Sequence, residues 1–234
     1  YRYYSPRQFE LFNTIRYLRA LDMPLGEIAD FLHGREVDRI EEKLCRQKAV
    51  VAEKQRELAR IERKIDAQLQ RLRDAQSAAL GSIEIVRVPP CRIFWTENHL
   101  AVQNTDDAEL STSRLAAAQT EATIFLGKVG FSISEEHLRE KRYDRYDGAF
   151  LLLDEADRFD GAFLALPETL CVRVRFRGHH LQSPEQYRRL ERFMAEHRLR
   201  LSGFSREITL IDQGFTRAPE KFVTEICIPV TEDA

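Results

Sequence analysis

The stretch VDRIEEKLCRQKAVVAEKQRELARIERKIDAQLQRL runs from Val37 to Leu72, and the rest of the chain is organised around it. Read at a spacing of seven residues, it contains an apolar stripe of Val37, Leu44, Val51, Leu58, Ile65 and Leu72. Neither proline nor glycine occurs between Arg35 and Leu80. This repeat predicts one helix of about 60 Å that supercoils against a partner helix. We therefore predict a homodimer through Val37–Leu72.

The second position of this seam is less regular. Three residues after the stripe positions come Ile40, Gln47, Lys54, Ile61 and Gln68, so this position is apolar only near the two ends. Polar residues in such a seam lower stability but fix register and partner. A solvated amphipathic helix lying on its own protein is the alternative, although such helices seldom run so long without a break.

The composition is that of an ordinary soluble protein. The 234 residues are 43% hydrophobic and 32% charged, which suits two modest domains. No apolar run approaches the roughly 20 residues of a membrane span, and the first residues do not read as a signal peptide. We expect a cytoplasmic protein with no membrane partner. Arg2, Arg7, Arg16 and Arg19 face only Glu10 in the first twenty residues, and such a basic end suits a phosphate backbone.

The metal-ligating residue types are scattered. The four cysteines are Cys45, Cys91, Cys171 and Cys227, and no two of them form a C-x-x-C pair. We predict buried, inert thiols rather than disulfides or a thiolate metal site. The adjacent His179 and His180 would point to opposite faces of a strand. No metal or cofactor is predicted.

Two short helices are predicted before the long one. Ser5-Pro6 is a strong helix start, and an apolar face follows at Phe9, Phe12, Ile15 and Leu18. A second helix begins after Met23-Pro24, and Gly34 is placed to end it. Its buried face comprises Leu25, Ile28, Ala29 and Leu32.

Three features of residues 1–76 occur together: YRYYS at residues 1–5, LRALDMPLGEIADFL at residues 18–32 and the long dimerising helix. In these features the segment resembles the DNA-binding region of MerR-family transcription regulators. The resemblance implies that the tyrosine-rich start is the end of a β-wing, from which Arg2 and Tyr3 contact DNA phosphates. In that family a helix-turn-helix precedes the wing. A wing alone would position the protein without reading bases, so we expect such a segment before Tyr1 rather than its loss.

The chain after the long helix predicts a second domain. Strands are predicted at 83–88 and 91–96, then a helix at 107–130 and strands at 149–153 and 162–166. The pattern repeats as a strand at 170–176, a helix at 183–197 and strands at 204–211 and 222–228. Two strand-helix-strand-strand units make an α+β domain with helices on one face of an antiparallel sheet and a concave face free for a ligand.

These features divide the chain into four parts. They are a partial DNA-binding domain (1–34), a coiled-coil helix (35–76), a linker (77–81) and a ligand-binding domain (82–234). The last part contains SPEQY at 183–187, REITLI at 206–211 and PEKFVTEI at 219–226. In these motifs it resembles the gyrase-inhibitor-like effector-binding domain of multidrug-sensing MerR-family regulators. The resemblance implies that Glu207 pairs with cationic drugs, that Tyr187 and Phe222 line the pocket, and that Glu220 falls at a pocket-acid position.

Physical chemistry supports a carboxylate and aromatic rings as a site for a lipophilic cation. A desolvated carboxylate offsets the hydration that the cation loses, and each aromatic face adds roughly 0.5–2 kcal/mol. On strand alternation alone, Glu207 could instead reach solvent or pair with an arginine. A stripe of arginines on one strand predicts a solvated strand face; it comprises Arg173, Arg175 and Arg177. If this stripe lined the pocket instead, an anionic ligand would be favoured.

We expect a ligand-responsive transcription regulator, not an enzyme, that binds promoter DNA as a homodimer. The resemblance implies an activator that acts on RNA polymerase indirectly, by distorting a promoter whose spacer is too long. One alternative is a hydrolase with Glu207 as general base, although no nucleophile with a base partner, phosphate loop or metal spacing is evident. The other is a dimer that sequesters drugs without binding DNA.

Overall fold

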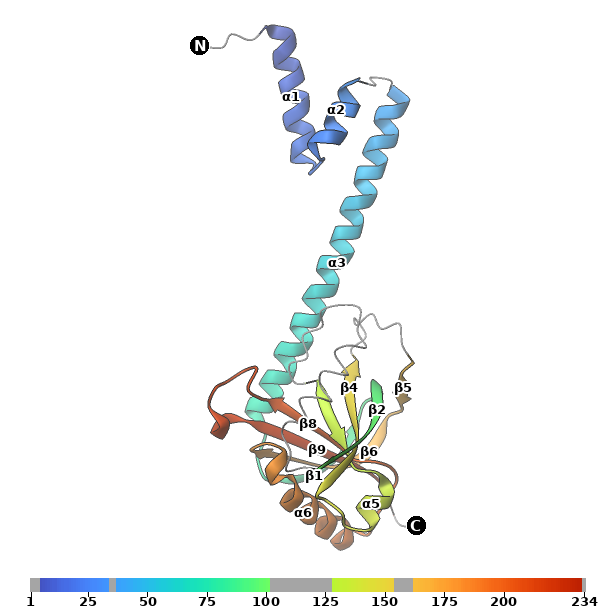
Figure 1. Cartoon of the computed structure of the whole chain (residues 1–234), viewed down its shortest axis with the longest axis vertical. Coiled ribbons are helices and arrows are strands. Elements are labelled where there is room, and N and C mark those ends of the chain that lie inside the picture. Colours follow the sequence, from blue (N-terminus) through green and yellow to red (C-terminus); the bar gives the residue numbers. More distant parts are fainter. Residues whose placement is uncertain (1–4, 34–36, 102–127, 154–161, 233–234) are drawn as a thin grey trace. The chain divides into compact units, whose positions relative to one another are not determined.

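A computed structural model describes residues 5–33, 37–101, 128–153 and 162–232 (Figure 1). The chain divides into two compact units, Tyr1–Arg63 and Lys64–Ala234. The first contains α1 (Pro6–Ala20), α2 (Leu25–His33) and the start of α3 (Val37–Ser77), and the second contains the end of α3 and a large sheet. The two short helices, the long helix and the α+β class are as predicted.

The start of α1 is a capping box. The Ser5 hydroxyl accepts a hydrogen bond from the Gln8 amide, and the Gln8 side chain accepts one from the Ser5 amide at 2.8 Å. Pro6 occupies the first turn, where its missing N–H leaves no intrahelical bond unmade. This local chemistry is why the helix begins where the sequence predicts.

The first unit has its own small core. Leu18, Met23, Ile28 and Phe31 are buried together, and Leu44 of α3 packs against them. Gln47 is also buried and donates a hydrogen bond of 2.7 Å to the Leu21 carbonyl. Two residues of the predicted coiled-coil seam, Leu44 and Gln47, are thus engaged within the chain itself.

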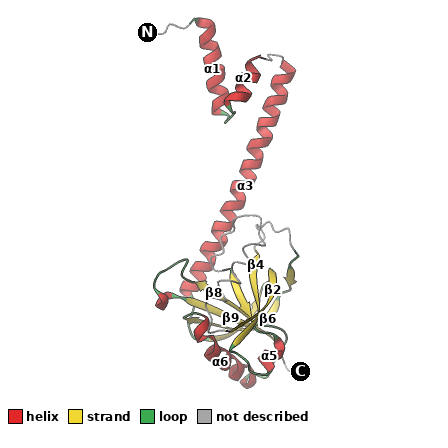
Figure 2. Ribbon diagram, in the orientation of Figure 1, coloured by secondary structure: helices red, strands yellow, loops and turns green. Residues whose placement is uncertain are grey.

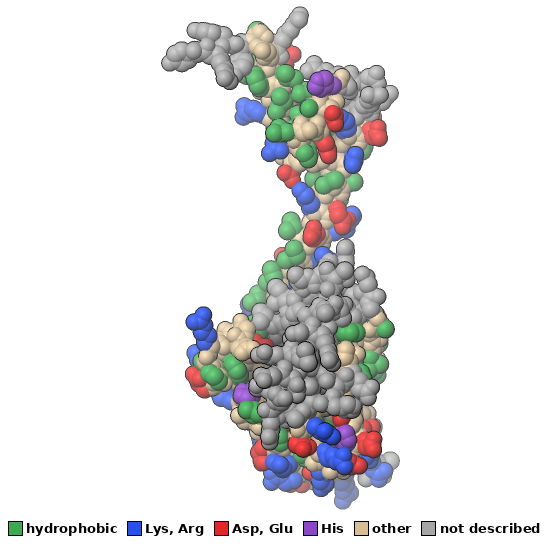
Figure 3. Space-filling view, in the orientation of Figure 1, with side chains coloured by type: hydrophobic (Ala, Val, Ile, Leu, Met, Phe, Trp, Pro, Cys, Tyr) green, Lys and Arg blue, Asp and Glu red, His purple; other side chains and the backbone are tan. Residues whose placement is uncertain are grey.

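Further along α3 the apolar stripe is exposed from Val51 to Ile65, whereas its last residue, Leu72, packs against the small core of Ala75, Ile211 and Val223. The side chains of Val51, Leu58 and Ile65 are 40%, 65% and 54% exposed, and Ile61 and Leu69 are exposed as well. The space-filling view shows hydrophobic side chains at the surface along this helix (Figure 3). Among the described residues, no helix combines the length and apolar character needed to cross a membrane.

The second unit is built on a nine-stranded sheet whose pairs are antiparallel (Figure 2). Its order is β1-β6-β9-β8-β3-β4-β2-β5, with β7 paired to β9. The strands are β1 (Ile83–Val88), β2 (Cys91–Ala101), β3 (Val129–Ser132), β4 (Arg145–Leu153), β5 (Leu164–Leu166), β6 (Thr169–Arg177), β7 (Leu199–Leu201), β8 (Arg206–Ile211) and β9 (Val223–Glu232). The two repeats meet where β3 pairs with β8, which sets Phe131 opposite Glu207.

Four helical segments accompany the sheet in the described residues. They are α5 (Glu135–Arg139), η1 (His180–Gln182), α6 (Ser183–Glu196) and η2 (Pro219–Lys221). The main core packs Tyr187, Leu190 and Met194 of α6 against one face of the sheet, including Val174 and Ile226. This is the helix-covered face, and the predicted helix 183–197 is confirmed.

The predicted helix at 107–130 needs a correction. Residues 102–127 lie outside the described residues, but Val129 and Gly130 belong to strand β3. A Cβ added to Gly130 would lie 2.3 Å from the Phe150 ring and 2.7 Å from the Glu207 carbonyl oxygen. Glycine therefore serves here to let neighbouring strands approach, not to end a helix.

We expect Gly130→Ala to destabilise the second unit, because the added methyl group has no room between β4 and β8. Overpacking of this kind costs about 1–3 kcal/mol. Thermal and urea unfolding followed by circular dichroism would measure the loss. Gly26→Ala on α2 is the control, since a methyl group added there would meet nothing within 4 Å. Equal unfolding of Gly130→Ala and the parent protein would contradict the described packing of β3.

Candidate functional site

Glu207 is a buried carboxyl group at the centre of the second unit. Along β8 the buried positions are Glu207, Thr209 and Ile211, as strand alternation predicts. The Glu207 side chain is 0% exposed and faces α6, because it contacts Ser183 at the start of that helix. It therefore lies on the helix-covered face of the sheet and does not reach solvent. The predicted architecture had placed the ligand on the opposite, concave face.

Three donors converge on one oxygen of this carboxyl group. Glu207 Oε1 lies 2.7 Å from the Tyr146 hydroxyl, 2.6 Å from His180 Nδ1 and 2.5 Å from the Ser183 hydroxyl. The two hydroxyl groups donate to Oε1, and the tautomer with a proton on Nδ1 lets His180 donate as well. The three donors come from β4, η1 and α6, so the carboxyl group joins three separate elements. No arginine is among its hydrogen-bond partners in the described residues.

The second oxygen of Glu207 is different. Oε2 is buried, and no described residue forms a hydrogen bond with it. A buried polar atom without a partner costs about 1–3 kcal/mol, and more when it is charged. A ligand that brings a hydrogen-bond donor or a positive charge to Oε2 would remove this cost. This atom is the clearest candidate contact for a ligand.

Aromatic rings surround the carboxyl group. Tyr146 is stacked on Phe131 with centroids 5.0 Å apart, and the His180 ring meets Phe131 edge-on at 4.7 Å. Both Tyr146 and Phe131 are buried. Tyr146, His180 and Phe131 were not predicted as site residues, because the sequence shows nothing that links them to Glu207. The only local signals were the paired histidines at 179–180 and the helix start at Ser183.

The other residues that the sequence predicted as site residues lie at different places in the structure. Tyr187 is fully buried, is stacked on Tyr143 at 5.5 Å and shares a hydrogen bond of 2.9 Å with Ser205. Phe222 is half-buried and meets the His179 ring edge-on, next to His180. Glu220 lies in η2 with an exposed side chain, so the structure does not bring it to Glu207. Arg2 and Tyr3 lie outside the described residues.

The arginine stripe lies on the other face of the sheet. Arg173 is 2.9 Å from Glu84, and Arg175 is 2.6 Å from Glu225. These arginines have carboxylate partners and do not face Glu207, since they alternate along β6 with the buried Val172, Val174 and Phe176. This arrangement gives no support to an anionic ligand at the Glu207 site.

The cysteines are free thiols. Burial raises the pKa of Cys171 and of Cys227, so both stay protonated and unreactive at neutral pH. Cys45 is exposed, which corrects the prediction that it is buried. Three of the four gather near Arg206, whose guanidinium nitrogens lie 3.2 Å from Cys91 Sγ and 3.7 Å from Cys171 Sγ. Within the described residues, no cluster of three or more His, Cys, Asp or Glu could hold a metal ion.

The buried tyrosines predict a specific pH dependence. Burial and the Glu207 charge raise the pKa of Tyr146 and Tyr187, and burial followed by Glu191 raises that of Tyr143. The unfolded chain releases these protons near pH 10 but the folded chain does not. The contribution of these tyrosines to the free energy of unfolding is therefore fully present below pH 10 and is lost as the pH rises above 10.

Absorbance at 295 nm during alkaline titration would test this. Of the seven tyrosines, we expect at least three to remain protonated until the protein unfolds, while in urea all seven titrate together near pH 10. Ionisation of all seven near pH 10, with circular dichroism unchanged, would contradict the burial described for these rings.

Comparison with solved structures places this fold beside known proteins. The protein in a cryo-EM structure of an EcmrR–DNA complex in EcmrR-RPo is similar over 100% of this chain and 87% of its own, with a TM-score of 0.51 and 17% identity. The crystal structure of the EcmrR C-terminal domain matches 65% of this chain and 98% of its own, with a TM-score of 0.51 and 14% identity. At these identities the likeness concerns the fold alone.

The sequence comparisons identify the second unit. No curated protein matches the chain. Residues 82–231, which contain Glu207 and all of its described hydrogen-bond donors, match the family described as GyrI-like small molecule binding domain. The chain therefore belongs to the GyrI-like family of small-molecule-binding proteins.

Proposed function

We propose that this protein is a homodimeric, DNA-binding transcription regulator that responds to a hydrophobic cation bound at Glu207. The observation that carries the proposal is the buried, unpaired Oε2 of Glu207 within a small-molecule-binding domain. It offers a negative partner where water is excluded, which is where a charge contact is strongest.

The surroundings of Glu207 favour a cation of loose shape. Tyr146 and Phe131 present aromatic rings beside the carboxyl group, and such rings attract cations without requiring one geometry. Among the described residues, no lysine or arginine forms an ion pair with Glu207, and His180, which is cationic only when protonated, contacts Oε1 and leaves Oε2 to a ligand. The site thus suits a lipophilic cation better than an anion or a neutral sugar.

The α3 stripe supports the dimer. Val51, Leu58 and Ile65 recur at intervals of seven residues and are at least 40% exposed in a single chain. Apolar side chains repeated in this way are stabilised when a second helix covers them. A second copy of the same helix presents the same stripe, so a coiled-coil homodimer satisfies both chains.

The likeness to the EcmrR–DNA complex supports DNA as the partner of the first unit, because that similarity spans the whole chain. Arg2 and Tyr3 are proposed to contact DNA phosphates, and RNA polymerase is affected indirectly through the shape of the promoter. The ligand activates transcription only if it binds one conformation of the protein better than the other, since a ligand shifts an equilibrium by its differential affinity.

We also propose binding rather than catalysis. A serine nucleophile needs a base in contact with its hydroxyl, with an acid behind that base. Here Ser183 and His180 both contact Glu207 Oε1, and the other ring nitrogen of His180 lies 3.4 Å from Thr209. This order of contacts supports a structural network more than a hydrolytic triad.

Isothermal titration with tetraphenylphosphonium and a neutral analogue of the same shape would test the ligand class. We expect Glu207→Gln to weaken binding of the cation at least about tenfold, because a charge-assisted contact is lost. Binding of the neutral analogue should change little. Glu220→Gln is the matched control, because that carboxyl group is exposed in η2. Equal weakening of cation binding by both variants, or cation binding that Glu207→Gln leaves unchanged, would contradict the assignment of Glu207 as the ligand-binding residue.

Sedimentation velocity would test the dimer through Leu58→Glu, which places a charge in the exposed apolar stripe. We expect the dimer to dissociate at concentrations at least about tenfold higher than for the parent protein, because a charge in a seam must be desolvated. Arg63→Glu, on the polar side of α3, is the control and should stay dimeric. A monomeric parent protein, or a dimer unaffected by Leu58→Glu, would overturn the proposed seam.

A further inference from the structure

A cavity lies on the face of the sheet opposite Glu207. On β3, Phe131 pairs with Glu207, so the next residue, Ser132, points to the other face. Ser132 and Trp95 line a cavity of about 510 Å³ there. This volume falls in the range of sites for small organic ligands. The cavity contains neither Glu207 nor any of its three donors in its described lining.

Trp95 forms a fixed wall of this cavity. Its indole N–H donates a hydrogen bond of 3.2 Å to the Ser132 hydroxyl. The ring lies close against Gly148, where an added Cβ would be 2.4 Å from indole carbon atoms. The side chain is nevertheless 38% exposed, a large aromatic surface held in one orientation and still open to a ligand.

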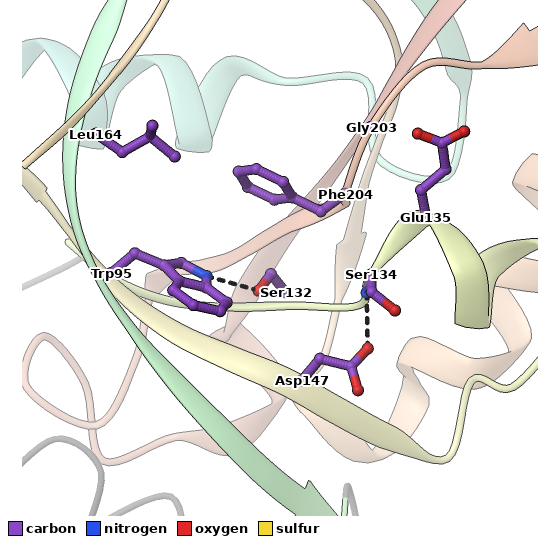
Figure 4. Close-up of a pocket in the computed structure, with 8 residues that line it drawn as sticks. All are labelled: Trp95, Ser132, Ser134, Glu135, Asp147, Leu164, Gly203 and Phe204. Carbon is purple, nitrogen blue, oxygen red and sulfur yellow. Dashed lines mark hydrogen bonds between the residues drawn. The ribbon is translucent and has the colours of Figure 1, made fainter.

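The residues that line the cavity divide it into an apolar end and an acidic end. Figure 4 shows Trp95, Leu164 and Phe204 on one side and Glu135 and Asp147 on the other. No lysine or arginine is among its described lining residues. One end therefore suits an aromatic ring, and the other end suits positive charge.

Asp147 is well placed to keep its charge. Burial opposes ionisation, but hydrogen bonds from the Ser134 amide at 2.7 Å and from His137 Nδ1 at 2.8 Å hold its pKa below the usual range. Glu135 is partly buried and pairs with Arg139, which faces solvent one turn along α5. Neither carboxylate has a cationic partner among the residues described as lining the cavity.

We propose that this cavity is a second ligand site, which binds a small planar aromatic cation between Trp95 and Phe204 with its charge towards Glu135 and Asp147. Stacking on a preoriented indole loses little conformational freedom, because the ring is already fixed by Ser132 and Gly148. Electrostatic attraction to the ring face and to the carboxylates favours the charged form of a ligand over its neutral form. This site does not depend on the proposed role of Glu207.

The only tryptophan of the chain provides a direct probe. The full chain would be labelled with 5-fluorotryptophan, and its single ¹⁹F resonance followed during titration with N-methylquinolinium and with neutral quinoline at pH 7.5. We expect a saturating shift with N-methylquinolinium and at least about fivefold weaker binding of quinoline, the scale of a cation–π and charge contact. Phe204→Leu and Glu135→Gln should each weaken binding of the cation by a similar factor.

Two controls separate this site from the first. Glu207→Gln should leave the titration of the fluorine resonance unchanged, whether or not it affects tetraphenylphosphonium binding. Thermal unfolding of Phe204→Leu and Glu135→Gln would show that both variants are folded. An unmoved resonance, equal affinity for quinoline, full retention of affinity in both variants, or loss of the shift in Glu207→Gln would each overturn the proposal.

Discussion

The buried carboxyl group of Glu207 is the constraint on which the ligand-binding unit depends. Placing a carboxylate where water is excluded costs several kcal/mol unless donors replace the lost hydration. Those donors come from Tyr146 in β4, His180 in η1 and Ser183 in α6. The sheet and the start of α6 must therefore be correctly assembled before Glu207 can be buried. The same group links the first repeat, through Tyr146, to the second.

The distribution of these donors explains how one residue can serve both structure and binding. All three contact Oε1, and none in the described residues contacts Oε2. His180 is held in turn by Thr209, whose hydroxyl lies 3.1 Å from that of Thr224. Such a network fixes the orientation of the carboxyl group before a ligand arrives. Oε1 stabilises the fold through its three hydrogen bonds, while Oε2 lacks a hydrogen-bond partner that a ligand can supply.

The features that could be predicted from sequence were those with a local period. Seven-residue spacing predicted α3, alternation predicted that Glu207 and Thr209 share one face of their strand but not that this face is buried, and Ser183-Pro184 marked the start of α6. The partners of Glu207 could not be predicted, because Tyr146 is 61 residues away in the chain and Ser183 is 24 away. Strand β3 was missed because four residues carry too little pattern, and its Gly130 resembles a helix stop until Phe150 is seen beside it.

The long helix shows how one periodic pattern can serve two purposes. Its stripe begins as a uniform repeat, yet Leu44 packs into the core of the first unit and Gln47 is bonded to the Leu21 carbonyl. A buried amide that already has a partner within its chain is not available to specify a partner chain. The polar position at Gln47 is thus explained by intramolecular packing, and the stripe residues with described, exposed side chains are Val51, Leu58 and Ile65. The proposed dimer contact accordingly extends from Val51 towards Ile65, where no described residue of the same chain buries the apolar side chains.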